Sequence, residues 1–464
     1  MIEDIKKLHT TTCKNNCLVL AYSENPADFP LARSFFNKLV ACTRNYPYTK
    51  TLATIWKKNQ VKKFIIILLT FNFWSCKTVK KTSSDYTKSQ NISEFKAFVK
   101  DFEKNYIYLT DKQELWDCVK QEYSKSVEQI SSVGEHIKFH ETLFNEFYDS
   151  HIHLNTNTSE SYRLKAPIYV VNKNGRTFIK NVWQTQISDT LKTNIIRAEI
   201  LSFNNQNFQE KIKNFPTKCQ NKNDKKIREW IANKIIAGKR NESRILQLKL
   251  QNGDLFTLDI DSLKLREEKY ALSPSIISSQ NIGVIRVNNT LGNKILVKEF
   301  KRVLPQMDST KAIIIDLRNT ISGGDTPVAE PIMGMFINKK LPYQLYENDK
   351  KKYFGHITPK KPYCNKPLYV LVNRWTGSMG EGIAIGLNST KTATIVGTEM
   401  ARLAGGMKTI NFKNHDYGFQ VSFEKIFDIN GNPREEFVPK NYVEQTQTEK
   451  DEILEYTIEK IKKL

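Results

Sequence analysis

The feature that most constrains this chain is a pattern of buried strands and tight turns that occurs twice between residues 311 and 408. Residues 312–315 form a continuous apolar run, which polar residues and the pair Gly323-Gly324 follow. This arrangement predicts a buried strand that leads into a tight loop. A second apolar run at 367–372 is followed by a turn around Ser378 and by a small, apolar, helix-like stretch, and a third strand is expected at 394–397. The order strand, turn, helix, strand predicts an α/β layer.

The turn around Ser378 is the part of this layer where chemistry is expected. A serine between a strand and a helix has its hydroxyl raised from the edge of the sheet, and the amides that follow are unpaired at the positive end of the helix. Such amides can bind the oxyanion of a tetrahedral acyl intermediate. The alternative is purely structural, because Ser378 with Glu381 three residues later is also a capping box. These residues alone leave both interpretations open.

Three ordered motifs carry a family resemblance. They are Asp-Leu-Arg-Asn with the later Gly-Gly (316–324), Leu-Val-Asn-x4-Ser-x2-Glu (371–381) and Ile-Val-Gly (395–397). In this order they resemble the carboxyl-terminal processing (tail-specific) serine peptidases and their tricorn-core relatives, over about residues 281–443. The resemblance implies a crotonase/ClpP-like α/β core with Ser378 as the nucleophile. It also implies oxyanion donors at Met379 and in the Gly323-Gly324 loop. That loop is one residue longer than the usual Asn-x-Pro-Gly-Gly form, so the identity of the donating glycine stays open.

The general base is expected to be a histidine. Many members of the resembled family use a lysine in a loop after the third strand, but residues 398–406 contain no lysine before Lys408. Arg402 cannot replace it, because a guanidinium stays protonated. Tricorn-like members carry a histidine where the helical N-terminal segment ends, and His151 with its neighbour Ser150 matches that position. A histidine near neutrality can accept a proton from a hydroxyl.

A glutamate near the end of the core completes the catalytic group in tricorn-like enzymes. The matching segment, residues 428–439, offers Glu435 and Glu436, of which Glu435 is the first candidate.

The whole chain is expected to be an α/β (α+β multidomain) protein, because 464 residues exceed one ordinary core. Helical periodicity predicts a helical N-terminal domain at 93–162, and strand-rich sequence predicts a β insert at 163–264. By resemblance the insert is PDZ-like and would bind a substrate tail as an added strand, although Ala198-Glu199-Ile200 stands where Gly-Asp-x-Ile is usual. The alternative is a β insert that only covers the active site. The peptidase core is expected at 275–445 and a C-terminal helix at 446–464.

The region before residue 93 resembles a bacterial lipoprotein leader. Basic residues, the short apolar run 64–71 and a small residue before Cys76 are typical of a signal peptide cleaved at cysteine. We therefore expect an over-extended translation at 1–60, the signal at 61–76 and a flexible tether at 77–92. This predicts a protein of the cell envelope, periplasmic or on the outer face, attached to the membrane through a lipidated Cys76. The alternative for 61–76 is a buried helix of an intracellular protein.

Charge and cysteine content limit the partners, metals and disulfides that the sequence predicts. The net charge is +22, but lysines are scattered without a basic stripe, so a solvated surface rather than a nucleic-acid partner is expected. The seven cysteines show neither a zinc pattern nor the spacing of a disulfide framework. We discount His151 and His153 as a metal pair for want of a third ligand, so no metal and no cofactor are expected.

Taken together, the sequence predicts a serine-type endopeptidase or C-terminal-processing peptidase acting on peptides or protein tails. Two alternatives remain: an inactive lipid- or peptide-binding protein on the same scaffold, and a crotonase-like acyl-CoA enzyme. The sequence predicts neither the natural substrate nor the oligomeric state.

Overall fold

The computed structural model describes residues 86–187 and 191–464. All of the described residues belong to one compact unit, residues 81–464. The expected over-extended segment, the signal with Cys76, and residues 77–85 of the expected tether lie outside the described residues. Among the described helices, none is long and apolar enough to cross a membrane.

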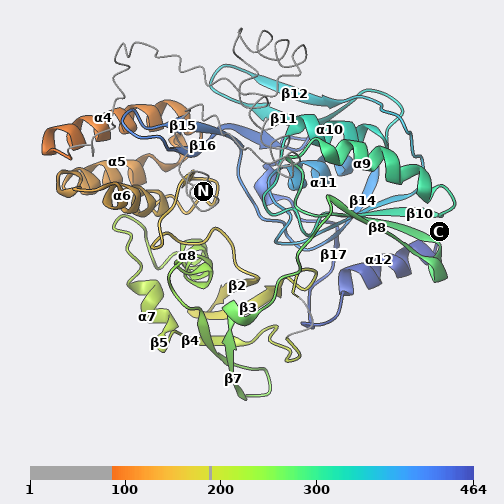
Figure 1. Ribbon diagram of the computed structural model, residues 1–464, viewed down its shortest axis with the longest axis horizontal. Coiled ribbons are helices and arrows are strands. Elements are labelled where there is room, and N and C mark those ends of the chain that lie inside the picture. Colours follow the sequence, from red (N-terminus) through yellow and green to blue (C-terminus); the bar gives the residue numbers. More distant parts are fainter. Residues whose placement is uncertain (1–85, 188–190) are drawn as a thin grey trace, which may run out of the picture. The chain divides into compact units, whose positions relative to one another are not determined.

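Three helices begin the described chain, as predicted (Figure 1): α4 (Lys88–Asn105), α5 (Gln113–Ser124) and α6 (Val133–Asn145). Helix α4 starts within the stretch predicted as tether, because Thr87 and Gln90 form a capping box at its N-terminus. The helices bury a cluster rich in aromatic side chains, which includes Phe98, Phe102 and Trp116. Phe419 from the C-terminal half belongs to the same cluster, so the helices pack against the core of the protein.

The β insert is a separate small sheet with two helices. Its strands run in the order β2-β3-β4-β6-β7, and β5 pairs with β4. The strands and helices are β2 (Ile168–Lys173), β3 (Arg176–Val182), β4 (Glu199–Phe203), β5 (Gln206–Asn207), α7 (Phe208–Lys213), α8 (Lys225–Ala237), β6 (Ile245–Lys249) and β7 (Leu255–Asp259). β6 and β7 form an antiparallel hairpin around the turn that contains Asn252, Gly253 and Asp254.

One cysteine pair corrects the sequence interpretation. Cys118 of α5 and Cys219, which lies between α7 and α8, form a disulfide with a Cα–Cα distance of 5.9 Å. The two residues are 101 positions apart in the sequence, and only the tertiary fold brings them together. The disulfide joins the helical domain covalently to the insert.

The central sheet has six strands in the order β17-β14-β13-β10-β9-β8. All neighbouring pairs are parallel except β8 with β9. The strands are β8 (Leu272–Ile277), β9 (Ile282–Val287), β10 (Ala312–Asp316), β13 (Leu368–Val372), β14 (Ala393–Gly397) and β17 (Asn441–Tyr442). The helices of this region are α9 (Ile295–Val303), α10 (Thr326–Gly334), α11 (Met379–Ser389) and α12 (Glu452–Lys462). Because β10 and β13 are buried along their whole length, they read as continuous apolar runs in the sequence.

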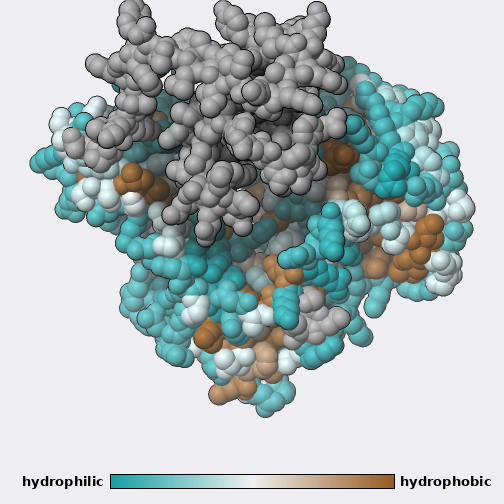
Figure 2. Space-filling model, in the orientation of Figure 1, coloured by the Kyte–Doolittle hydropathy of each residue, from teal (hydrophilic) through white to brown (hydrophobic). Residues whose placement is uncertain are grey.

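A second sheet connects the core to the helical domain. It contains β1 (His153–Leu154), β11 (Leu341–Glu347), β12 (Lys352–Ile357), β15 (Gly406–Asn411) and β16 (Gly418–Phe427). β16 pairs with β1 at one end and with β11 at the other. On the face shown in Figure 2, hydrophilic residues cover most of the coloured surface and apolar ones form small separate patches.

Candidate active site

The loops that carry the predicted motifs meet at one edge of the central sheet. β10, β13 and β14 are parallel neighbours, so their carboxyl ends point the same way and the loops that follow them lie together. Thr320 after β10 and Thr376 after β13 form a parallel bridge. The Gly377 N–H donates to the Thr320 carbonyl at 3.2 Å. The loop with the two glycines therefore runs directly beside the turn with Ser378, as the sequence predicts.

Ser378 has an unusual backbone conformation. Its φ is 49° and its ψ is −109°, a combination that a residue with a side chain adopts only when its surroundings hold it there. Gly323 is in immediate contact with it: a Cβ added at Gly323 would lie 2.4 Å from Ser378 Cβ and 3.0 Å from Ser378 Oγ. Gly323 itself has a φ of 64°. Only glycine fits both this conformation and this contact.

The amides around Ser378 differ in their availability. The Gly323 N–H donates to the Thr320 carbonyl at 2.9 Å and is therefore already used. The N–H groups of Gly324 and Met379 have no hydrogen-bond partner among the described residues. Gly324 packs so closely against the backbone of Leu291 that no side chain would fit there. A Cβ added at Gly324 would lie 2.1 Å from the carbonyl carbon of Leu291. Two unpaired amides thus remain beside the serine, one from each loop.

Glu381 anchors the Ser378 turn to the loop that follows β14. Its carboxylate accepts the N–H of Ser378 at 2.8 Å, as in the expected capping box. It also accepts the N–H groups of Arg402 at 2.8 Å and Leu403 at 3.2 Å. The side chain is fully buried, with an exposed fraction of 0%. Burial raises its pKa to about 7, although the nearby Arg434 guanidinium and the three N–H donors act in the opposite direction.

His151 contacts the same loop from the other side. Its Nδ1 lies 2.8 Å from the Ala404 carbonyl, and only a protonated Nδ1 can donate to a carbonyl oxygen. The neutral ring therefore carries its lone pair on Nε2, which is the form a general base needs. The backbone N–H of His151 donates to Asp149 Oδ1 at 2.9 Å. The histidine is 6% exposed, and burial together with the charge of Arg434 lowers its pKa to about 4, while Asp149 acts in the opposite direction.

The remaining predicted site residues lie in different environments. Ser150 is exposed, so it does not orient His151 from within the site, and Asp149 is the side chain that contacts the histidine. Glu435 is half-buried and hydrogen-bonded to the Tyr108 hydroxyl, and burial raises its pKa. Glu436 is exposed on the outer side of the 3-10 helix η7 (Arg434–Glu436). The structure thus separates the two candidate glutamates, and only Glu435 faces inward.

Two contributors to this site went unrecognised in the sequence. Arg434 is 3% exposed and donates to the carbonyls of Leu403 at 2.6 Å and Gly405 at 2.7 Å, which fixes the loop between Glu381 and His151. Asp149 stands two residues before His151, a spacing at which an Asp side chain often accepts a backbone N–H. That local pattern could have identified Asp149, whereas Arg434 is distant in sequence from everything it contacts.

The groove in which a PDZ domain would bind a peptide is occupied in the insert. β2 is an edge strand, and an added peptide strand would pair with its free side. Asn233 of α8 already pairs with Val170 of β2, accepting its N–H at 3.0 Å and donating to its carbonyl at 2.9 Å. An extra strand cannot pair at Val170 unless Asn233 moves.

A cavity of about 610 Å³ lies between the insert and the core. Lys180 of β3, Glu399 and Tyr442 line it and are joined by hydrogen bonds, Lys180 to Glu399 at 2.8 Å and Tyr442 to Glu399 at 3.0 Å. Arg374 and Arg402 line it as well. Since Arg402 also binds Glu381 through its backbone, this cavity adjoins the loop that holds the Ser378 turn.

Residues 281–443 match the family model described as Peptidase family S41, so the chain carries a peptidase domain of family S41. This match defines the class of the chain as a serine-type peptidase, a hydrolase. The family resemblance expected from the sequence is confirmed, and peptides or proteins are the corresponding substrate class.

Solved structures share the fold at low sequence identity. Mature CPAF complexed with lactacystin aligns with a TM-score of 0.56 and 12% identity, covering 81% of this chain and 97% of that chain. The photosystem II D1 C-terminal processing protease aligns with a TM-score of 0.50 and 12% identity, covering 76% of this chain and 93% of that one. Tricorn protease aligns with a TM-score of 0.43 and 13% identity, covering 81% of this chain and 37% of its own. No curated protein matches in sequence. The alignments with mature CPAF and with the D1 processing protease confirm the predicted mixed α/β fold.

Proposed function

We propose that this protein hydrolyses peptides or protein tails through an acyl-enzyme on Ser378, with His151 as the general base. The observation that carries the proposal is the loop 402–405, which contacts His151 directly and Ser378 through the Glu381 carboxylate. Leu403 shares the Glu381 carboxylate with the Ser378 N–H, and the next residue, Ala404, accepts from His151 Nδ1. One short segment thereby links the nucleophile turn to the base.

The chemistry follows from these groups. His151 Nε2 takes the proton of Ser378 Oγ while Oγ attacks the carbonyl carbon of the scissile bond. The N–H groups of Met379 and Gly324 donate to the oxyanion that forms. The tetrahedral intermediate expels the amine, which receives its proton from His151. Water, deprotonated by the same histidine, then hydrolyses the ester and restores the serine.

The supporting roles are proposed from contacts. Asp149 orients His151 through its backbone N–H and offsets part of the positive potential of Arg434. Glu435 is a positioning residue, buried against Tyr108 near the same arginine. The exposed Ser150 and Glu436 are assigned no step.

We favour processing of protein tails over general endopeptidase activity, because one of the structural neighbours is named a C-terminal processing protease. The cavity between the insert and the core is the candidate place for the substrate. In its wall, basic side chains such as Arg374 and Arg402 outnumber the acidic ones, which suits the negatively charged carboxylate at the end of a protein tail. The competing proposal is an inactive lipid- or peptide-binding protein. Such a protein would need neither the strained backbone of Ser378 nor the fixed tautomer of His151, so these two features favour the peptidase.

We also propose that the protein is exported and anchored through a lipidated Cys76. The disulfide between Cys118 and Cys219 supports this location, because disulfides persist mainly in oxidising compartments outside the cytosol.

Hydrolysis is tested by incubating the purified protein with an unfolded polypeptide of known sequence and mapping the products by mass spectrometry. Cleavage by the parent and its loss in Ser378→Ala is the expected result. Equal cleavage by both proteins, or binding of the polypeptide without cleavage by either, would overturn the proposal.

A further inference from the structure

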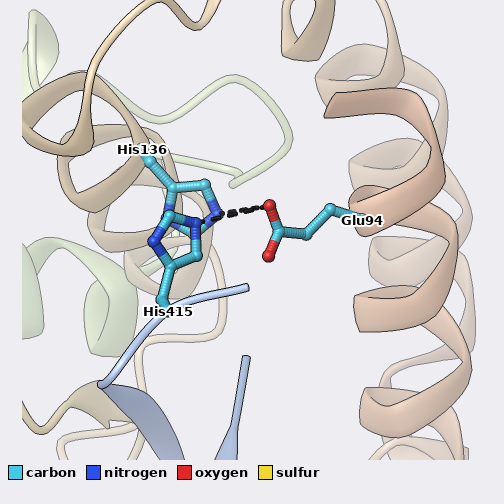
Figure 3. Close-up of side chains that lie close together, drawn as sticks. All are labelled: Glu94, His136 and His415. Atoms are coloured by element: carbon cyan, nitrogen blue, oxygen red, sulfur yellow. Dashed lines mark ion pairs between the residues drawn. The ribbon is translucent and has the colours of Figure 1, made fainter. Parts of the chain in front are cut away.

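A cluster of histidines far from the Ser378 turn in sequence has no role in the peptidase mechanism. Glu94 of α4, His136 of α6 and His415 from the β15–β16 connection come together in the helical domain (Figure 3). One ligand atom of each lies within 4.8 Å of the others. Their side chains are 10%, 3% and 5% exposed, respectively.

Several polar atoms of this cluster lack hydrogen bonds. The Nε2 atoms of His136, His415 and the adjacent His140 are buried without a hydrogen-bond partner, and so is Glu94 Oε1. The Glu94 oxygen that faces the His136 and His415 nitrogens is the other one, Oε2. A buried polar atom without a partner is destabilising. The unpaired Nε2 atoms of His136 and His415, both beside the Glu94 carboxylate, therefore point to a bound ion.

The distances fit a shared metal ion better than direct contacts. Glu94 Oε2 lies 3.7 Å from His136 Nε2 and 3.4 Å from His415 Nε2, beyond ordinary hydrogen-bond length. Ligand atoms at about 2.0–2.1 Å from a tetrahedral zinc ion are about 3.3 Å apart. The Glu94 oxygen is therefore spaced from each histidine nitrogen nearly as two ligands of one such ion would be.

The other nitrogen of each helix histidine is held so that Nε2 faces the cluster. His136 Nδ1 lies 2.8 Å from the Tyr417 hydroxyl, and His140 Nδ1 lies 3.0 Å from the His136 carbonyl. Metal-binding histidines commonly have this arrangement, in which a second hydrogen bond fixes the orientation of the ring.

We infer that Glu94, His136 and His415 bind a divalent transition-metal ion, with zinc as the best match to one carboxylate and two imidazoles. His140 is a further imidazole beside them, with its ring centroid 4.2 Å from that of His136.

The position of the site indicates a structural role. It joins two helices to the connection between β15 and β16, and β15 begins immediately after Gly405, at the end of the loop that contacts His151. A bound ion would hold this hairpin against the helices. The spacing His136-x-x-x-His140 on one helix face was visible in the sequence, but Glu94 and His415 are added only by the fold.

The test uses the full-length protein without an affinity tag of histidines. The protein is loaded with Zn²⁺, passed over a chelating resin and analysed for metal content. Co²⁺ is also substituted for Zn²⁺, because bound Co²⁺ absorbs visible light and so reports its coordination. We expect about one ion per chain and the intense visible absorption of a four-coordinate cobalt site, in which water supplies the fourth ligand. His136→Gln and His415→Gln should each lose most of the bound metal, while the control His356→Gln, an exposed histidine on β12, should keep it.

A conservative variant protects the test against misfolding. Tyr417→Phe removes only the hydroxyl beside His136 Nδ1 and should weaken metal affinity by about 10- to 100-fold. If the parent retains no stoichiometric metal, or if the His136 and His415 variants retain as much as the parent, the inference is overturned. Tyr417→Phe with unchanged affinity would contradict the proposed support of His136.

Discussion

The backbone N–H of Ser378 and the carboxylate of Glu381 form a 2.8 Å hydrogen bond at the start of α11, and the same carboxylate accepts the N–H groups of Arg402 and Leu403. Glu381 is therefore more than a helix cap. It ties the turn that carries the proposed nucleophile to the loop that contacts the proposed base. Loss of this connection should therefore reduce catalysis.

Glu381→Gln should reduce kcat by about 10²-fold, because misplacing a catalytic group by about 1 Å has an effect of that size. A glutamine amide offers one acceptor oxygen where three N–H donors require two, so the 402–403 segment must shift. The measurement is kcat for peptide hydrolysis, with the melting temperature recorded alongside. Glu436→Gln is the matched control, because Glu436 is exposed on η7 and should keep parental activity. Full activity in Glu381→Gln would show that this connection is not needed.

The pH dependence of activity should report His151. A base works only when neutral, so kcat/KM should fall as the pH drops through the pKa of His151, which burial and Arg434 lower to about 4. An unshifted histidine would lose activity near about 6.5 instead. A second, partial fall in kcat/KM is expected as the pH drops through about 7, because protonation of Glu381, whose pKa is raised to about 7, weakens its bonds to the three N–H donors. This second fall should be absent in Glu381→Gln.

Substitution of the base should confirm its identity. His151→Gln should lower activity about as much as Ser378→Ala, since residues that act as a unit do not contribute additively. His153→Gln and Lys408→Ala are the controls. Lys408 is a residue of β15 whose Nζ lies over the Phe423 ring at 5.3 Å. An essential Lys408 with a dispensable His151 would mean that a serine–lysine pair is the catalytic group.

Gly323→Ala should inactivate the enzyme with a moderate loss of stability. The added methyl group would lie 3.0 Å from Ser378 Oγ, and the φ of 64° strains any residue with a side chain. The readouts are turnover and melting temperature. Gly134→Ala is the control, because its Cβ would meet nothing closer than Ser132 Oγ at 3.9 Å. Turnover at the parental rate in Gly323→Ala would show that the two loops are farther apart than described.

The proposed anchor is tested by expression in a bacterium that processes lipoproteins. We expect a membrane-associated product whose first residue is a lipid-modified Cys76. Cys76→Ser should abolish the lipid modification. A soluble product that retains residues 1–60 would contradict both the anchor and the suspected translation start.

The parts of the fold that were predictable are those with a strong local pattern. The strands β10 and β13 are buried along their length and therefore form nearly continuous apolar runs, and the helix α4 shows its buried phenylalanines at helical spacing. Ser378 and Gly323 were predictable because a sharp turn and a close approach restrict residue type. Nothing local distinguished Gly323 from Gly324 as a donor. That difference arises from one backbone hydrogen bond, from Gly323 to Thr320.

The features that were missed depend on segments distant in sequence. The pairing of Cys118 with Cys219 and the cluster of Glu94 with His136 and His415 arise only when separate elements pack together. The exposure of Ser150, next to a buried histidine, likewise depends on how the turn after α6 meets the 402–405 loop.

The central claim is that Ser378 is a nucleophile activated by His151. It is tested most directly by labelling the purified protein with a serine-reactive fluorophosphonate and identifying the modified peptide by mass spectrometry. The account predicts a single adduct on Ser378 that forms rapidly in the parent, slowly in His151→Gln and not at all in Ser378→Ala. An adduct on another residue, or a parent that reacts no faster than its unfolded form, would contradict the account.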